Sequence, residues 1–233
     1  MKAVILAAGK GVRMLPITET IPKVLIEING KPFLYYILKS LQKAGFDEFG
    51  LIVGYRKEMV ADFLKEYNFR ATLIEQKEQL GTAHALKQAE EFVDGEDFIA
   101  LGGDNIWSVN DLKKFNINDD LNYISGLKVE NPEKYGVLVV KDDRLVRIYE
   151  KPKEFVGNLI NTGLYKFTPE IFEAIEKIGL SPRGEYELTD AITLLAGQGK
   201  VKVIKVEDFW KDLGRLDDIP GVEIFMKKHW REG

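Results

Sequence analysis

The chain has 233 residues, a formal net charge of −4 and 45% hydrophobic residues, enough for one sizeable α/β domain. The absence of cysteine excludes disulfides, thiolate zinc sites and a cysteine nucleophile, and the presence of only two histidines argues against a histidine metal cluster or a Ser-His-Asp triad. Charges of both signs are interspersed and no uninterrupted apolar run reaches about 18 residues, so we expect a cytoplasmic protein without a nucleic-acid partner, a membrane span or a processed leader.

The first half of the chain predicts alternating strands and helices. Continuous apolar runs indicate buried strands, and apolar residues at helical spacing indicate amphipathic helices. In chain order we expect a strand at 2–7, a helix at 31–45, a strand at 49–55, a helix at 56–67, a strand at 71–76, a helix at 81–93 and a strand at 97–104. This alternation is typical of a parallel sheet covered on both faces.

In the second half the pattern changes to strands without intervening helices. We expect strands at 122–130, 135–152 and 159–167, the second of them a hairpin that turns at Asp142 and Asp143. Helices at 169–179 and 185–199, a strand at 201–206 and a helix at 221–230 complete the chain. Because we find no repeat, low-complexity tract or linker, we predict that this half extends the same sheet.

The loop from Leu6 to Lys23 follows the first predicted strand and is rich in small residues. Its Gly9-x-Gly11 spacing is not a dinucleotide-binding fingerprint, because the third glycine would fall at Met14. A P-loop is excluded because Gly11 is followed by Val12. In open α/β sheets ligands bind at the carboxyl ends of strands, so this loop and those at "GY", "EQ" and "GGDN" are candidates to meet in one crevice.

Two interpretations of this loop stay open on physical grounds alone. Ala7, Ala8 and Gly9 let the backbone approach a ligand closely, and amides in such a turn can hold anions, with Arg13 and Lys23 adding positive charge. The alternative is an ordinary solvated basic loop after a core strand.

The residues of this loop resemble the G-x-G-x-R-x-x-P-x-T-x-x-x-P-K signature of the sugar nucleotidyltransferases. The matching positions are Gly9, Gly11, Arg13, Pro16, Thr18, Pro22 and Lys23. Further matches follow in the family's order: "EQLGTAHAL", "LGGDN", "YGVLV", "YEKP", "INTGLY", "GEYELTDAI" and "WKDLG". The resemblance covers about residues 2–214 and implies a Rossmann-like α/β fold with a mixed, mainly parallel sheet and helices on both faces, the nucleotide-diphospho-sugar transferase type.

The resemblance implies transfer of a nucleoside monophosphate from a nucleoside triphosphate to a sugar 1-phosphate, with release of pyrophosphate. It implies Arg13 and Lys23 as catalytic residues and Asp104 and Asp212 as ligands of Mg²⁺. The implied nucleotide-binding residues are Leu6, Ala7, Ala8, Gly9, Gly11, Gln76, Gly81 and Thr82. The implied sugar-phosphate-binding residues are Gly136, Glu150, Lys151 and Asn161.

Each of these groups also has a plain structural interpretation. Asp104 could cap the helix that follows it, Asp212 could be a turn residue before Gly214, and Gln79 or Thr82 could cap the predicted helix at 81–93. The residues assigned to the sugar phosphate could be hairpin ends with solvated charges. We expect His84 to pack or to support the site instead of acting as a base. Tyr186, Glu187 and Asp190 predict a capped helix start, so we leave them out of the site.

We predict one catalytic domain over 1–233, with 1–120 binding mainly the nucleotide and 121–233 mainly the sugar phosphate. Bifunctional relatives carry a β-helix or acetyltransferase domain, and without one we expect a single activity; the sequence leaves self-association open. The "GTAHA" segment resembles uridylyltransferases, whereas "YEKP" is shared with thymidylyltransferases. We therefore expect UTP or dTTP with a glucose or N-acetylglucosamine 1-phosphate, although a flipped Gln76 carboxamide would suit cytosine.

Two other functions compete with this one. The first is a cytidylyltransferase or other nucleotidyltransferase that acts on a different phosphate, such as phosphocholine or a sugar phosphate outside the glucose series. For phosphocholine, Trp107, Trp210 and Tyr186 could form an aromatic cage around the quaternary ammonium. The second is a non-catalytic regulatory homologue. The joint presence of the two cations and the two carboxylates of the family's site argues against the second.

Overall fold

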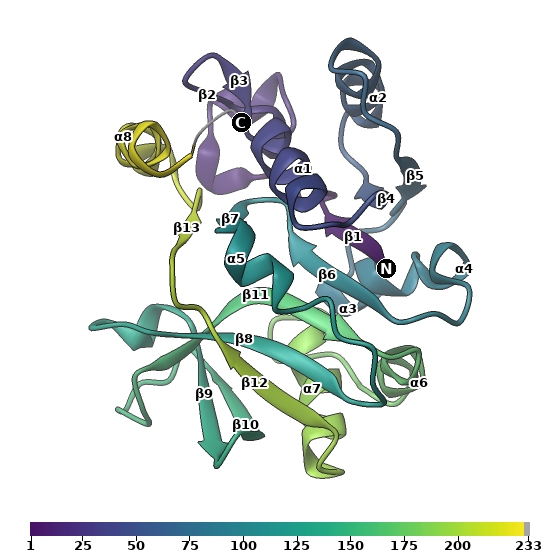
Figure 1. The fold of residues 1–233 in the computed structure, drawn as a ribbon, viewed down its shortest axis with the longest axis vertical. Coiled ribbons are helices and arrows are strands. Elements are labelled where there is room, and N and C mark those ends of the chain that lie inside the picture. The colour runs from purple at the N-terminus through teal and green to yellow at the C-terminus, as the bar shows by residue number, and fades with distance from the viewer. Residues whose placement is uncertain (231–233) are drawn as a thin grey trace.

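The computed structural model describes residues 1–230, and its centre is a nine-stranded sheet (Figure 1). Across the sheet the strand order is β5-β4-β1-β6-β11-β8-β12-β10-β9. The strands are β1 (Lys2–Leu6), β4 (Glu48–Val53), β5 (Thr72–Glu75), β6 (Phe98–Gly102), β8 (Asn122–Lys128), β9 (Gly136–Lys141), β10 (Arg144–Glu150), β11 (Leu159–Phe167) and β12 (Val201–Lys205). Both halves of the chain therefore build one continuous sheet, as the sequence predicted.

The strand directions make this sheet mixed but mainly parallel. β1 lies between β4 and β6 and runs parallel to both, and β4 runs parallel to β5. Antiparallel pairing begins at β11, which contacts β6 on one side and β8 on the other. When the pairings are followed across the sheet, all its strands run in one direction except β10 and β11. The predicted sheet type is confirmed, as is the hairpin of β9 and β10 with its turn at Asp142.

Helices cover both faces of the sheet because successive strand residues point to opposite sides. Ala3 and Ile5 of β1 pack into one core, whereas Val4 packs into the other. The first core is covered by α1 (Phe33–Lys43), α2 (Lys57–Glu66), α5 (Val109–Lys113) and α8 (Ile219–His229). The second is covered by α3 (Thr82–Lys87), α4 (Glu90–Val93), α6 (Glu170–Glu176) and α7 (Leu188–Gly197). Within residues 1–230, none of the helices combines the length and the apolar character that crossing a bilayer requires.

Two short ribbons and several 3₁₀ turns complete the fold. The ribbons pair β2 (Glu27–Ile28) with β3 (Lys31–Pro32), and β7 (Asn105–Trp107) with β13 (Trp210–Asp212). The 3₁₀ turns are Val12–Met14, Ile17–Glu19, Lys23–Leu25, Pro132–Lys134 and Leu216–Asp218. The β7–β13 ribbon joins segments about a hundred residues apart in the chain, at the carboxyl end of β6.

The sequence-based boundaries differ from the observed ones at several helices, most informatively at the first predicted helix and at the helix predicted over 81–93. The first predicted helix begins later, at Phe33, because Lys31 and Pro32 pair in β3. The helix predicted at 81–93 is two helices, α3 and α4. The amides of Gln88 and Ala89 bond to carbonyls three residues back instead of four, and this tighter turn ends α3.

Candidate active site

The loop that follows β1 is held in a defined shape from two sides. The buried Thr18 donates its hydroxyl to the carbonyl of Gly11 over 2.9 Å. At the end of β4, Tyr55 and Arg56 both donate to the carbonyl of Glu19, over 2.7 and 2.9 Å. Thr18 belongs to the signature yet points into the loop, so its contribution is to the shape of the turn.

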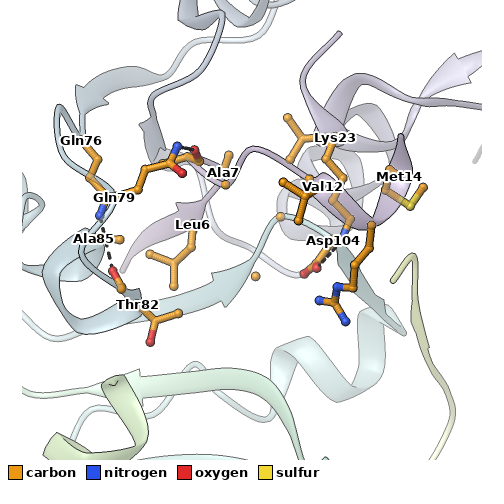
Figure 2. A pocket seen from close by; sticks show the side chains of 18 of the residues that line it. Leu6, Ala7, Val12, Met14, Lys23, Gln76, Gln79, Thr82, Ala85 and Asp104 are labelled. Atoms are coloured by element: carbon orange, nitrogen blue, oxygen red, sulfur yellow. Dashed lines mark hydrogen bonds and ion pairs between the residues drawn. The ribbon is translucent and has the colours of Figure 1, made fainter. Parts of the chain in front are cut away.

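A cavity of about 490 Å³ opens between this loop, the carboxyl ends of β1 and β6, and the start of α3. The predicted residues that line it are Leu6, Ala7, Ala8, Gly9, Gly11, Arg13, Lys23, Gln76, Gly81, Thr82 and Asp104. In Figure 2, Gln76, Gln79 and Thr82 lie along one side of the cavity, while Lys23 and Asp104 lie along the other. The structure thus brings together the residues assigned to the nucleotide, both cations and one of the two carboxylates.

The floor of the cavity is built from small residues packed at close range. Gly103 follows β6, and its amide donates to the carbonyl of Leu6 over 2.9 Å. A Cβ at Gly103 would lie 2.8 Å from Cγ1 of Val24 and 3.4 Å from Cβ of Ala7. Only glycine therefore fits where the end of β6 passes the turn after β1.

Lys23 and Asp104 form an ion pair inside the cavity. The lysine Nζ donates to Oδ2 of Asp104 over 2.6 Å. The other carboxylate oxygen, Oδ1, accepts from Nδ2 of Asn105 over 2.6 Å. The indole N–H of Trp210 donates to Oδ1 of Asn105 over 2.9 Å, and because an indole can only donate, it fixes which end of that amide faces Asp104. Arg13 is exposed and makes no hydrogen bond or ion pair within residues 1–230.

The β7–β13 ribbon brings Asp212 next to Asp104. Asp212 pairs with Asn105, and the amide of Leu213 donates to the carbonyl of Asp104 over 2.8 Å. Burial raises the pKa of Asp212, and the carboxylates of Asp218 and Asp104 raise it further. The alternative roles of both residues are wrong: Ser108 caps α5 in place of Asp104, and Asp212 is a strand residue instead of a turn residue.

These two carboxylates suit a hard divalent cation. A nearby cation would offset the charge repulsion that helps to raise the pKa of Asp212, and Mg²⁺ is commonly held by one or two carboxylates together with water and substrate phosphates. Within residues 1–230 no cluster of three or more histidine, cysteine, aspartate or glutamate side chains is arranged to hold a metal alone. The donor set therefore fits a magnesium ion that shares its coordination with a phosphate ligand.

On the opposite side of the cavity, Gln76 and Gln79 are fixed by hydrogen bonds. Gln76 follows β5, is 5% exposed, and has its Nε2 3.0 Å from Nδ1 of His84 and 3.4 Å from the carbonyl of Gly81. Gln79 donates its amide to the carbonyl of Ala8 over 2.6 Å, which links this side to the small-residue turn. The supporting position predicted for His84 agrees with its contact to Gln76.

The turn at Gly81 packs against the segment before α7. Gly81 has a φ of 111°, and a Cβ there would lie 2.5 Å from the carbonyl oxygen of Tyr186. Thr82 accepts a hydrogen bond from the amide of Leu188 over 2.9 Å, so its hydroxyl satisfies the start of α7 and not of its own helix. Capping of α3 by Gln79 or Thr82 is therefore wrong, since no side chain in the described part of the chain caps that helix. The same packing carries Glu185, which sequence reasoning left out, to the edge of the cavity.

The residues assigned to the sugar phosphate form a second group, outside the lining of this cavity. Gly136 of β9 pairs with Glu150 of β10, and a Cβ at Gly136 would lie 3.1 Å from Oε2 of Glu150 and 3.8 Å from Cβ of Asn161. Nζ of Lys151 is 4.0 Å from Oε1 of Glu150. Asn161 is held by donation of its amide to the hydroxyl of Tyr165 over 2.8 Å.

An aromatic contact connects this second group to the carboxylates. The rings of Tyr135, the neighbour of Gly136, and of Trp210 meet edge to face with centroids 5.7 Å apart. Burial raises the pKa of Tyr135, and the nearby carboxylates of Asp212 and Asp218 contribute to the rise. This contact places Tyr135, the neighbour of Gly136, against the β7–β13 ribbon that also carries Asp212.

The fold and the site define an α/β protein with a nucleotide-sized cavity lined by cations and a carboxylate at the carboxyl ends of parallel strands. Residues 2–228 match the nucleotidyl transferase family, and the chain belongs to it. It is 43% identical to the bifunctional protein GlmU of Methanocaldococcus jannaschii over 94% of this chain and 52% of that protein. It is 38% identical to the UTP–glucose-1-phosphate uridylyltransferase AglF of Haloferax volcanii, over 94% of this chain and 93% of that one.

Solved structures agree with this assignment. A Bacillus anthracis protein assigned as a glucose-1-phosphate thymidylyltransferase superposes with a TM-score of 0.89 at 27% identity and covers 100% of this chain and 97% of its own. The nucleotide-diphospho-sugar transferase type of fold, predicted from the sequence motifs, is thereby confirmed. The chain spans about half the length of the GlmU relatives that it matches.

Proposed function

We propose that this chain is a sugar-1-phosphate nucleotidyltransferase that uses UTP or dTTP and a glucose or N-acetylglucosamine type of sugar 1-phosphate. The observation that carries the proposal is the convergence of Arg13, Lys23 and Asp104 on one cavity floored by small residues. AglF, named as a UTP–glucose-1-phosphate uridylyltransferase and aligned over 93% of its length, supports the substrate class.

In the proposed reaction, a phosphate oxygen of the sugar 1-phosphate attacks the α-phosphorus of the triphosphate. The bond from that phosphorus to the bridging oxygen breaks, and pyrophosphate leaves. Two anions have to meet, and negative charge builds on the phosphoryl oxygens, so positioning and cations supply most of the catalysis. Arg13, which has no protein partner within residues 1–230, and Lys23 are the groups we assign to that charge.

We assign the metal to Asp104 and Asp212, which would hold Mg²⁺ together with phosphate oxygens of the substrate. When bound, the ion neutralises phosphate charge and orients the phosphoryl group. The residues around it keep the carboxylates in position: Asn105 and Trp210 restrict Asp104, and the β7–β13 pairing restricts Asp212.

We assign the base to the side of the cavity that carries Gln76, Gly81 and Thr82, and the triphosphate to the turn from Leu6 to Gly11. We assign the sugar phosphate to Gly136, Glu150, Lys151 and Asn161. Glu150 and Asn161 offer acceptors and donors to sugar hydroxyls, and Lys151 offers a cation. The division into a mainly nucleotide-binding part, 1–120, and a mainly sugar-binding part, 121–233, is part of the same proposal.

The phosphocholine alternative loses its structural basis. Trp107 is 1% exposed, packs in the core and donates its indole N–H to Thr162 over 3.1 Å. Since it cannot face a ligand, the cage of Trp107, Trp210 and Tyr186 does not form. The regulatory alternative predicts an inactive protein and is tested by the experiment below.

A coupled pyrophosphate-release screen tests the proposal directly. UTP, dTTP, CTP, ATP and GTP are each combined with a panel of sugar 1-phosphates in the presence of Mg²⁺. We expect pyrophosphate to appear in step with a nucleotide sugar for UTP or dTTP. Absence of release from every pair would contradict the proposal and favour the regulatory homologue.

A further inference from the structure

Among the described residues 1–230 the carboxamide of Gln76 has two partners, and both contact its nitrogen. Nε2 lies 3.4 Å from the carbonyl of Gly81 and 3.0 Å from Nδ1 of His84 (Figure 2 draws the first of these contacts). Gln76 is 5% exposed and lines the cavity. Its amide is therefore enclosed by protein except on the side that faces the cavity.

The two partners fix which end of the carboxamide faces the protein. A backbone carbonyl only accepts, so the end of the amide that faces Gly81 is the NH₂ group. Nδ1 of His84 then accepts from the same NH₂ group, and the neutral ring carries its proton on Nε2. A flipped carboxamide would put its oxygen against the carbonyl oxygen of Gly81 and would lose that hydrogen bond.

The carboxamide oxygen is consequently directed to the cavity. Within residues 1–230 it accepts no hydrogen bond, and no buried side-chain oxygen or nitrogen in this part of the chain lacks a partner. The oxygen must therefore be accessible, and the cavity is the space that Gln76 lines. The amide of Gly81, beside it, also donates to no protein acceptor within the described residues.

We propose that His84 is a positioning residue that selects the base by holding the Gln76 carboxamide with its oxygen outward. An outward acceptor pairs with the ring N–H of a uracil or thymine imide. It repels the corresponding ring nitrogen of cytosine, which is itself an acceptor. The inference rests on the proposed function, because it takes Gln76 as the residue that faces the base.

Binding of UTP and CTP to four proteins tests this, with calorimetry as the readout so that turnover is not needed. The proteins are the wild type and His84→Ala, His84→Asn and His84→Gln. In the wild type we expect UTP to bind more tightly than CTP. In His84→Ala the ratio of the two dissociation constants should fall about tenfold, which corresponds to about 1.4 kcal/mol. His84→Asn should restore the ratio, since its Oδ1 takes a position close to Nδ1 of histidine, whereas the longer His84→Gln should not.

A structural role for His84 would give different results. Equal weakening of UTP and CTP in His84→Ala, or an unchanged ratio with the circular dichroism spectrum retained, would overturn the inference. So would a wild type that binds no pyrimidine nucleotide. The same proteins are assayed for pyrophosphate release with a sugar 1-phosphate. A shifted binding ratio without turnover would support the positioning role of His84 and refute the proposed reaction. Turnover with an unshifted ratio would support the reaction and refute the role of His84.

Discussion

Replacement of Asp111 by asparagine should destabilise the fold more than any surface change nearby. The Asp111 carboxylate is 1% exposed and accepts from Ser108 over 2.8 Å and from Lys114 over 2.9 Å. It also accepts from the backbone amides of 207–209 over 2.9, 3.0 and 3.3 Å, which pins the segment that leads into β13. One oxygen of this carboxylate becomes an NH₂ group in the variant and faces donors.

The size of the effect follows from these contacts. Hydrogen bonds to a charged group contribute about 1.5–3 kcal/mol each, and removal of one partner from a buried charged pair costs about 3–5 kcal/mol. For a domain of this size that loss lowers the Tm by about 6–20 °C. The control is Glu207→Gln, which removes the exposed partner of the same Lys114 and should change stability by less than about 1 kcal/mol.

Urea unfolding followed by circular dichroism measures both variants, and its pH dependence checks the cause. Burial alone would raise the pKa of Asp111, but its hydrogen bonds from the Glu207 amide, Lys114, Ser108 and the Asp208 amide outweigh burial and lower the pKa below the ordinary 3.8. Stability from this group is therefore complete above that pH and is lost as the pH falls through the lower folded value. Asp111→Asn should lose stability less steeply below about pH 4 than the wild type. An Asp111→Asn protein within about 1 kcal/mol of the wild type would refute the reasoning.

Three further predictions concern the site. Arg13→Ala and Lys23→Ala should each lower kcat/KM about 10²-fold or more with an unchanged circular dichroism spectrum, because in the proposed reaction both cations stabilise charge that grows in the transition state; near wild-type kinetics would show that the loop is an ordinary surface connection. Gly81→Ala should raise the KM for the triphosphate and lower the Tm, since its Cβ would meet the Tyr186 carbonyl at 2.5 Å, whereas Gly95→Ala, also at positive φ but with no atom within 4 Å, should leave the KM unchanged. Exhaustive chelation should stop pyrophosphate release and added Mg²⁺ should restore it. Full turnover after chelation would contradict the assignment of a metal to Asp104 and Asp212.

The central strands and the helices on both faces could be predicted because their signal is local. Short apolar runs such as the one in β1 and amphipathic helices such as α1 are visible in any short window of sequence. The order of the strands is set by contacts between segments far apart, and no window contains it. The β7–β13 ribbon illustrates this: each strand has three residues and neither has a periodic pattern, yet their pairing brings Asp212 to Asp104.

The residues of the candidate site also divide into those with a local sequence signal and those placed by contacts between distant segments. The signature drew attention to the turn after β1 and to Lys23, which line the cavity together. Gln79 and Glu185 were missed, because what brings them there is a bond to the Ala8 carbonyl and the packing of Gly81 on Tyr186. The hydroxyl of Thr82 serves a helix about a hundred residues away, a partner that no capping rule applied along the sequence would find.

The close packing at Gly103 restricts which substitutions the floor of the cavity can accept during evolution or in the laboratory. A side chain added there would collide with Val24 at 2.8 Å, and the adjoining Ala7 is itself enclosed. A larger residue in the floor would therefore destabilise the fold before it altered ligand recognition. Exposed residues at the rim, such as Gln79 and Glu185, can be exchanged with less effect on the sheet than Gly103. A mutagenesis library that explores ligand recognition can therefore include those two positions and should leave the strand ends intact.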